Sequence, residues 1–409
     1  MERNVKKVIQ VALGLITGIG GFLEIGSVTT SAQAGAAFGF QLIWALLLGM
    51  LCLIFMLEMS GRFSAVSQHT VVEALRDRFG FGFFSIVLTG VAVVVFLVLI
   101  AELGGVALAL KIASGAGVPL WAFPVAFLAW LLLWKGNLQL IENLASILGL
   151  ITICFAVAVY RLQPQWEAVS SGAIPSLPTS NKAHYWFLAV SILGASVSPY
   201  LIYFYSAGAV EEKWDESYLG ANRIISGIGT AFGALLAVAV LMVAAMVLHP
   251  RGIEVENFEQ MAQMMTTPFP RWGVALFAIS LAITCFGAAM EIALSISYMF
   301  GQGLGWNSSE EARPADEARF STVYTVILAG ATLPLLVGVD PIKVTTISMA
   351  LTAATLPLAI VPFLVLMNDS NYLHDKTNGL VSNTVVVMIS TIACLLAIVA
   401  IPLQVFGGG

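Results

Sequence analysis

The sequence predicts an all-α polytopic membrane protein of about eleven transmembrane helices, arranged as a 5+5 inverted repeat in which helices 1 and 6 are broken. First, 59% of the 409 residues are hydrophobic and only 10% are charged, whereas soluble domains are about 25% charged. Second, the apolar residues form continuous runs of about 20 residues or more, the length that spans a bilayer. Third, two of these runs are interrupted near their middles. This composition excludes a soluble enzyme, a nucleic-acid-binding protein and a disordered chain.

Apolar runs separated by polar or turn-rich segments place the helices near residues 8–39, 40–60, 83–113, 118–135, 139–160, 184–211, 222–248, 271–301, 319–338, 341–367 and 381–405. We expect one transmembrane domain over 1–409, with repeat one at about 8–160, repeat two at about 184–367 and an extra helix at about 381–405. Segments 161–183, 249–270 and 302–318 are rich in proline or acidic residues and are expected to lie outside the membrane.

The distribution of basic residues predicts the orientation. With the N-terminus in the cytoplasm, the cytoplasmic segments carry about twice as many lysines and arginines as the outer segments. Cytoplasmic loops are enriched in these residues. We therefore expect an integral protein of a bacterial inner (plasma) membrane, with a cytoplasmic N-terminus and an external C-terminus.

The first run is too long and too polar at its centre to be a plain span. As a straight helix it would extend about 48 Å at about 1.5 Å per residue, against a hydrocarbon core of about 30 Å. Its middle, residues 20–31, reads GGFLEIGSVTTS. A charged side chain such as Glu24 costs at least about 2.5–3.5 kcal/mol at the bilayer centre, so it indicates function. We expect the helix to break at Gly26.

The sixth run repeats this pattern at a matching position, where residues 194–200 read GASVSPY. Pro199 has no N–H, so the carbonyl of Ala195 loses its helical partner and becomes available to a hard cation. Two broken helices at corresponding positions indicate a transporter of inverted repeats with its site at the midplane. The alternative is a pair of ordinary kinks, which would leave Glu24 unexplained.

These segments resemble the NRAMP family of divalent-metal transporters, which share the leucine-transporter-like fold of the APC superfamily; the likeness is to a divergent NRAMP-related clade. Residues 35–40, GAAFGF, resemble the family's segment after its first helix. Counting back, EIGS at 24–27 falls on the family's Asp-Pro-Gly-Asn, and residues 194–200 resemble its Gly-Ala-Thr-Val-Met-Pro-His. Residues 101–105, AELGG, resemble Ala-Glu-Val-Ile-Gly, and 355–357, TLP, resemble Gln-Leu-Pro. The likeness covers nearly the whole chain.

The resemblance implies a metal site at Glu24, Ser27, Ala195, Ser198 and Thr355. Glu24 takes the place of the family's acid, Ser27 of its amide, Ser198 of its methionine sulfur and Thr355 of its glutamine, while the carbonyl of Ala195 is kept. The site as written is all oxygen, a donor set that suits Mg²⁺, Mn²⁺ or Ca²⁺ rather than softer ions.

The resemblance also implies an altered proton route. The family's sixth-helix histidine is Tyr200 here, and its third-helix aspartate position is Leu99. Histidine titrates near neutral pH and tyrosine near 10. Glu102 is kept, as a proton or gating residue together with Tyr200 or as a structural acid. We therefore expect weak or absent proton coupling.

The sequence thus predicts a secondary transporter that moves divalent cations by alternating access, and not an enzyme. Its expected partners are the metal ion, as substrate rather than cofactor, and the lipid bilayer, with no nucleic acid. The alternatives are an amino-acid or organic-solute transporter of the same fold and a non-transporting membrane sensor or scaffold.

Overall fold

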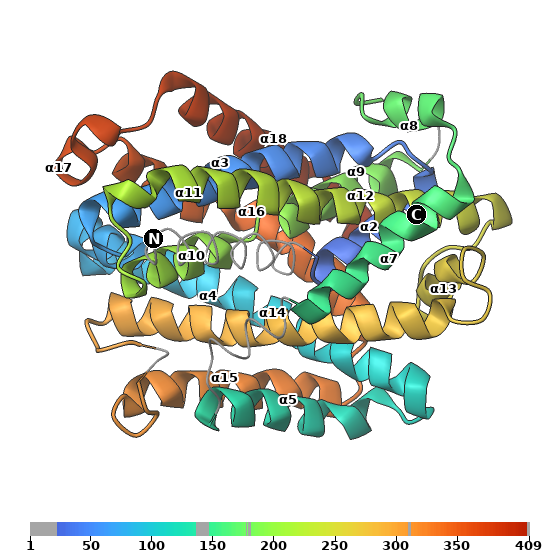
Figure 1. Cartoon of the computed structure of the whole chain (residues 1–409), viewed down its shortest axis with the longest axis horizontal. Helices are drawn as coiled ribbons and strands as arrows, with labels where there is room; N and C mark the ends of the chain where they lie inside the picture. Colours follow the sequence, from blue (N-terminus) through green and yellow to red (C-terminus); the bar gives the residue numbers. More distant parts are fainter. Residues whose placement is uncertain (1–22, 136–146, 177, 179–180, 310–311, 407–409) are drawn as a thin grey trace, which may run out of the picture.

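The computed structural model describes residues 23–135, 147–176, 178, 181–309 and 312–406, and in these ranges the chain forms helices and no strand. Nine helices of the described residues are long and apolar enough to cross a membrane, and a shorter apolar helical segment covers Ile147–Leu162. The long helices lie side by side as one bundle (Figure 1). An all-α polytopic fold is therefore confirmed, while the repeat boundaries stay a prediction.

The α-helices, in chain order, are α2 (Ile25–Phe38), α3 (Ile43–Ser67), α4 (Val71–Ser114), α5 (Val118–Lys135), α7 (Ile153–Leu162), α8 (Trp166–Gly172), α9 (Lys182–Ser196), α10 (Pro199–Glu211), α11 (Leu219–Ile224), α12 (Thr230–Val247), α13 (Phe258–Ala262), α14 (Gly273–Gly303), α15 (Ala318–Leu336), α16 (Pro341–Met367), α17 (Ser370–Leu373) and α18 (Leu380–Phe406). A π-helical turn, η3 (Ile225–Gly229), joins α11 to α12, and short 3₁₀ turns include η6 (His374–Lys376).

Most predicted helices have counterparts whose ends differ by a few residues. The predicted helix 83–113 lies in α4, which starts earlier, at Val71, and is kinked at Gly80 (φ 77°, ψ 158°). Because such a positive φ suits glycine, this kink separates the first turns of α4 from its membrane part. The stretches 8–22 and 139–146 of two predicted helices lie outside the described residues. The loop predicted at 161–183 contains α8, and the one at 249–270 contains α13.

The sixth predicted helix is broken as expected. It consists of α9 and α10, separated by Val197 (φ −122°, ψ 67°) and Ser198 (φ −79°, ψ 121°). Pro199 is the first residue of α10, where its missing N–H costs no helical hydrogen bond. A residue before proline is disfavoured in the α region, which explains the extended Ser198.

The first predicted helix is described from Leu23 onward, and in this part Gly26 does not break it. Glu24 is extended (φ −101°, ψ 176°) and α2 begins at Ile25, while the part of the predicted helix before Leu23 lies outside the described residues. Gly26 is helical, and the expectation that it forms the break is wrong. Its lack of a side chain serves close packing instead, because a Cβ there would lie 2.6 Å from Sδ of Met349 in α16.

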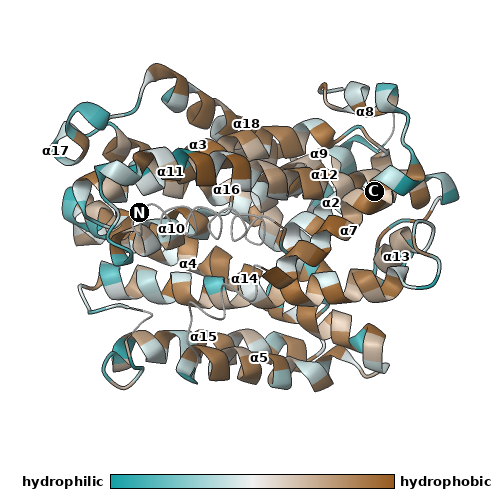
Figure 2. Cartoon of the chain, viewed as in Figure 1, coloured by the Kyte–Doolittle hydropathy of each residue, from teal (hydrophilic) through white to brown (hydrophobic). Residues whose placement is uncertain are grey.

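Hydrophobic residues predominate along the helices of the bundle (Figure 2), and the mostly apolar interior also holds a smaller set of buried polar residues. A Cβ on Gly35 of α2 would lie 2.2 Å from the carbonyl oxygen of Leu241 in α12. Such close backbone contact is typical of small residues between membrane helices. Large exposed apolar residues such as Ile86, Leu120, Val326 and Leu395 lie on the outside, where lipid chains would surround them.

Candidate metal site

The carboxylate of Glu24, which directly precedes α2, is held by two hydroxyl groups at the break between α9 and α10. Ser198 Oγ donates to Oε1 (3.4 Å) and Tyr200 Oη donates to Oε2 (3.0 Å). Glu24 is only 1% exposed, and Ser198 and Tyr200 are equally buried. The start of α2 and the break between α9 and α10, 174 residues apart in sequence, therefore meet at one closed polar site.

Ser27 completes the first turn of α2 around the same residue. Its Oγ accepts a hydrogen bond from the backbone N–H of Glu24 (3.1 Å) and donates one to the backbone carbonyl of Glu24 (3.1 Å). The structure therefore brings Ser27, Glu24 and Ser198 together. The backbone N–H groups at the start of α2 also give this site the positive end of a helix dipole.

A second buried acid reaches the start of α2 from α4. Glu102 accepts a hydrogen bond from the backbone N–H of Ile25, with distances of 3.2 Å to Oε1 and 3.4 Å to Oε2. Glu102 is fully buried. Because Ile25 follows Glu24 directly, the carboxylates of Glu24 and Glu102 both lie at the start of α2.

Neither carboxylate has a basic partner in the part of the chain that the structure describes. The ion pairs there involve Glu58, Asp77, Glu259, Asp369 and Asp375. A buried charge without a partner is costly. A bound cation would compensate this cost.

Ala195 lies in the last turn of α9, next to the break between α9 and α10, and is buried. Pro199, four residues later, has no N–H to donate to its carbonyl. At Gly194 the backbone of α9 presses against α16, because a Cβ there would lie 1.8 Å from the carbonyl oxygen of Met349. This contact fixes the position of the adjoining Ala195.

Thr355 is half-buried in α16, and its hydroxyl donates to the carbonyls of Leu351 (3.0 Å) and Thr352 (3.1 Å) of the same helix. These contacts do not join it to Glu24. The residue of α16 that packs on both α2 and α9 is Met349, whose thioether lies against Gly26 and whose backbone lies against Gly194. Sequence reasoning missed Met349 because a methionine in an apolar run gives no local signal.

The remaining two positions of the predicted proton route are also buried. Tyr200 donates to Glu24, and Leu99 lies one helical turn before Glu102 in α4. An apolar side chain at position 99 neither accepts nor releases a proton. Of the described residues at these positions, Glu24, Glu102 and Tyr200 carry exchangeable protons.

Known structures share this fold. A manganese transporter of Eremococcus coleocola, in a crystal structure with an aromatic bis-isothiourea compound, matches with a TM-score of 0.80 at 18% identity, covering 97% of this chain and 87% of that one. Mhp1, a nucleobase-cation-symport-1 family transporter in a closed conformation, matches with a TM-score of 0.64 at 15% identity, covering 95% and 91% of the two chains. MhsT in complex with L-phenylalanine matches with a TM-score of 0.61 at 15% identity, covering 95% of this chain and 97% of that one.

A comparison of the sequence with family models identifies the family of this chain. The family model of Nramp, natural resistance-associated macrophage protein-like, matches residues 14–402, nearly the whole chain. This match agrees with the break between α9 and α10 and with the buried acid at the start of α2. The protein is therefore a member of the Nramp family, a membrane transporter of metal ions with the leucine-transporter-like fold and not an enzyme.

Proposed function

We propose that the protein moves divalent metal cations, Mg²⁺ or Mn²⁺ among them, across the membrane by alternating access around Glu24. The observation that carries this proposal is the burial of Glu24 and Glu102 without a basic partner among the described residues. Two carboxylates balance the charge of a divalent ion. An organic substrate with its own carboxylate would meet repulsion at the same place.

The proposed ligands are the carboxylate of Glu24, the hydroxyls of Ser27 and Ser198 and the carbonyl of Ala195. All are hard oxygen donors, which suit Mg²⁺ and Mn²⁺. The manganese transporter of E. coleocola, which has the same fold, supports Mn²⁺ as one substrate. Thr355 was predicted to join this set; its hydrogen bonds within α16 favour a role outside the first ring of ligands.

A partly hydrated ion is favoured by further hydroxyls on α2. Ser31 lies one turn beyond Ser27 on the same helix face, and its buried Oγ has no hydrogen-bond partner among the described residues. Buried polar groups without protein partners commonly hold ordered water. Mg²⁺ keeps several water molecules when it binds to proteins, so Ser31 would contact the hydration shell.

We further propose that proton coupling is weak or absent. Tyr200 donates to Glu24 where a histidine would be able to exchange protons near neutral pH, and a tyrosine titrates near 10. Leu99 removes a second exchangeable group. The binding and release of the ion then need no proton carrier of matching pKa.

Uptake by proteoliposomes tests the transport proposal. We expect Mg²⁺ and Mn²⁺ to enter vesicles that contain the protein, and Glu24→Gln to abolish entry, while a dye inside the vesicles reports little acidification. The matched control is Glu167→Gln, because Glu167 is exposed on α8 and its loss leaves the site intact. Uptake of amino acids but not of metal ions would overturn the proposal, as would unchanged metal uptake by Glu24→Gln. Acidification in proportion to metal uptake would overturn only the absence of coupling.

For the orientation, we propose that the end of the bundle with α11 and α17 faces the cytoplasm (Figure 1). The basic side chains of Arg62, Arg76, Arg223 and Lys376 support this direction, since positive charge favours the cytoplasmic side. A C-terminal alkaline phosphatase fusion is then active and a C-terminal green fluorescent protein fusion is dark. The reverse pattern would contradict the proposed orientation.

A further inference from the structure

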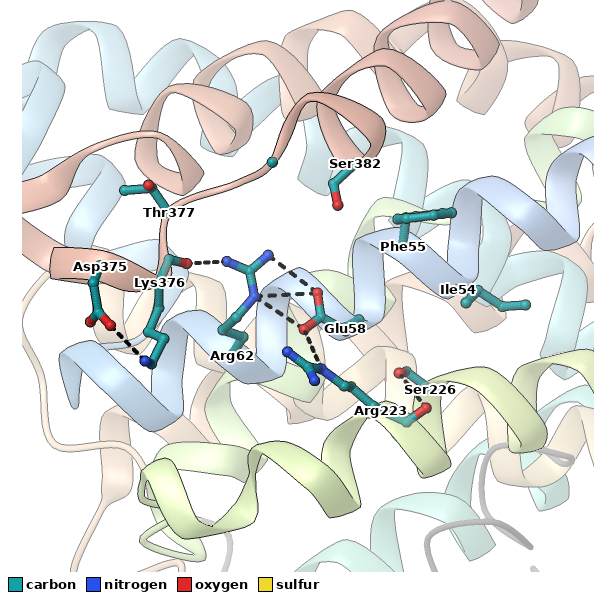
Figure 3. Close-up of a pocket in the computed structure, with 11 residues that line it drawn as sticks. Ile54, Phe55, Glu58, Arg62, Arg223, Ser226, Asp375, Lys376, Thr377 and Ser382 are labelled. Carbon is teal, nitrogen blue, oxygen red and sulfur yellow. Dashed lines mark hydrogen bonds and ion pairs between the residues drawn. The ribbon is translucent and has the colours of Figure 1, made fainter.

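A pocket of about 490 Å³ lies at the end of the bundle that carries α11 and α17, and none of the residues that line it belongs to the Glu24 site. Figure 3 shows that its walls come from three places: α3, the junction of α11 with η3, and the segment from η6 into α18. Its lining is Ile54, Phe55, Glu58, Arg62, Arg223, Ser226, Asp375, Lys376, Thr377, Gly379 and Ser382.

Basic groups outnumber acidic groups in this pocket. Arg62, Arg223 and Lys376 face Glu58 and Asp375, which leaves one net positive charge. Two hydroxyl groups, from Thr377 and Ser382, add hydrogen-bonding capacity to the same walls (Figure 3), while the hydroxyl of Ser226 already donates to the carbonyl of Asn222. The lining therefore suits an oxyanion.

Arg62 holds the walls of the pocket together through hydrogen bonds and an ion pair made by its guanidinium. Its guanidinium pairs with Glu58 (Nε to Oε1, 3.1 Å), donates to Oδ1 of Asn378 (2.7 Å) and donates to the carbonyl of Lys376. Asn378 in turn donates to Oδ1 of Asn383 in α18 (2.8 Å). These contacts hold the segment before α18 against α3, so the pocket wall is fixed before a ligand arrives.

Arg223 is the basic group that is left for a ligand. Its side chain is 70% exposed, and its Nε lies 3.9 Å from Oε1 of Glu58, a loose contact (Figure 3). Arginine presents a planar set of donors that matches phosphate oxygens. Lys376 carries a further charge on the opposite wall, although Asp375 pairs with it at 2.7 Å.

The surroundings of the pocket are apolar and exposed. Ile54 and Phe55 line its α3 side, and beside the pocket Ile224 and Ile228 are 45% and 61% exposed, and Leu380 and Val381 are 82% and 68% exposed. Exposed apolar residues on membrane helices face lipid chains. The basic groups therefore lie at the level where the hydrocarbon region meets the head groups.

We propose that this pocket binds the phosphate of an anionic phospholipid, with Arg223 as its main contact and the acyl chains along Ile54, Phe55 and the exposed residues of η3 and α18. Basic pockets between transmembrane helices are common sites for such head groups. A free phosphate shares the charge but not the apolar contacts, and the apolar surroundings favour the lipid. The bound lipid would join α3, η3 and the start of α18 and so stabilise the bundle.

Native mass spectrometry and thermal unfolding of the full-length protein test this proposal with phosphatidylglycerol, phosphatidylcholine and inorganic phosphate as probes. We expect phosphatidylglycerol to bind and to raise the unfolding temperature, with no comparable effect from the other two. Arg223→Gln should weaken phosphatidylglycerol binding by about tenfold, the value of one charge-assisted contact. Because Arg223 is exposed, this variant should fold normally and keep metal uptake in neutral lipid.

Arg313→Gln is the matched control, since Arg313 is an exposed arginine outside the pocket. It loses the same charge, and we expect it to bind phosphatidylglycerol like the unchanged protein. Equal losses in the two variants would show attraction by net charge alone and would overturn the proposal. Equal stabilisation by phosphatidylcholine, or by inorganic phosphate, would also overturn it.

Discussion

The phenolic hydroxyl of Tyr200 lies 3.0 Å from Oε2 of Glu24 and donates a hydrogen bond to it. Tyr200 is the second residue of α10, and Glu24 immediately precedes α2. This bond therefore connects the start of α10 to the start of α2 through the acid that we assign to the ion. A cation that enters the site has to compete with, or displace, the donors that Glu24 already has.

Tyr200→Phe should destabilise the protein without ion and enlarge its stabilisation by ion. The substitution leaves a buried carboxylate with one donor fewer, and a hydrogen bond to a charged group contributes about 1.5–3 kcal/mol. A bound Mn²⁺ or Mg²⁺ supplies the missing positive charge. Thermal unfolding with and without saturating ion measures both effects.

Tyr203→Phe is the control for that experiment. Tyr203 lies on the same helix and is buried, but its hydroxyl has no hydrogen-bond partner among the described residues. Its removal should leave the unfolding temperature unchanged or slightly raised, with the ion effect of the unchanged protein. If the two variants behave alike, the bond between Tyr200 and Glu24 has no special role.

Glu102→Gln and Glu102→Leu should separate the charge of this acid from its hydrogen bond. The glutamine can still accept from the N–H of Ile25, so we expect nearly normal stability but weaker binding of divalent ions. The leucine leaves that N–H unpaired in the interior, which costs about 1–3 kcal/mol. Unfolding temperature and ion titration measure the two effects. A glutamine variant with normal ion affinity would limit Glu102 to a structural role.

Met349→Leu should shift the ion preference of the site toward Mg²⁺. The thioether of Met349 lies against Gly26, between Glu24 and Ser27 in sequence, and soft sulfur ligands favour softer metals. We expect Cd²⁺ to bind several-fold more weakly, with Mn²⁺ and Mg²⁺ unchanged, because leucine keeps nearly the same volume at a cost under about 1.5 kcal/mol. Competition titrations with the three ions measure this preference. Proportional losses for all three would indicate altered packing instead.

The sequence predicted the parts of the site that depend on local chemistry. A carboxylate in the middle of an apolar run and a proline in a second run are costly wherever the helices pack, and the structure has Glu24 at the start of α2 and Ser198 and Pro199 at the break between α9 and α10. Ser27 enters the predicted site through the resemblance to the NRAMP family, in which it takes the place of the amide.

The partner from α16 could not be predicted in the same way. Which side of that helix meets α2 and α9 depends on packing, and Met349 and Thr355 look equally plausible in an apolar run. The first break was placed at Gly26 because glycine weakens helices, whereas in the structure the extended residue is Glu24 and Gly26 makes room for Met349. Position 26 is a glycine because α2 and Met349 are in close contact there. The periodicity of the sequence does not reveal such a contact.

Gly194→Ala should damage both stability and ion binding. A Cβ at this position would lie 1.8 Å from the carbonyl oxygen of Met349, and backbone atoms cannot move aside as a side-chain end can. Overpacking of this kind costs about 1–3 kcal/mol or more, and it would push α9 and the carbonyl of Ala195 away from α16. We expect a lower unfolding temperature and weaker binding of Mn²⁺ and Mg²⁺.

Gly208→Ala is the matched substitution on the other side of the break. Gly208 is inside α10, and a Cβ there would meet nothing within 4 Å, so alanine should stabilise the helix by up to about 1 kcal/mol. The loss of stability in Gly26→Ala should lie between those of the other two variants, since the added Cβ would meet the flexible end of Met349 rather than backbone. If Gly194→Ala were as harmless as Gly208→Ala, the close contact of α9 with α16 could not be what positions Ala195.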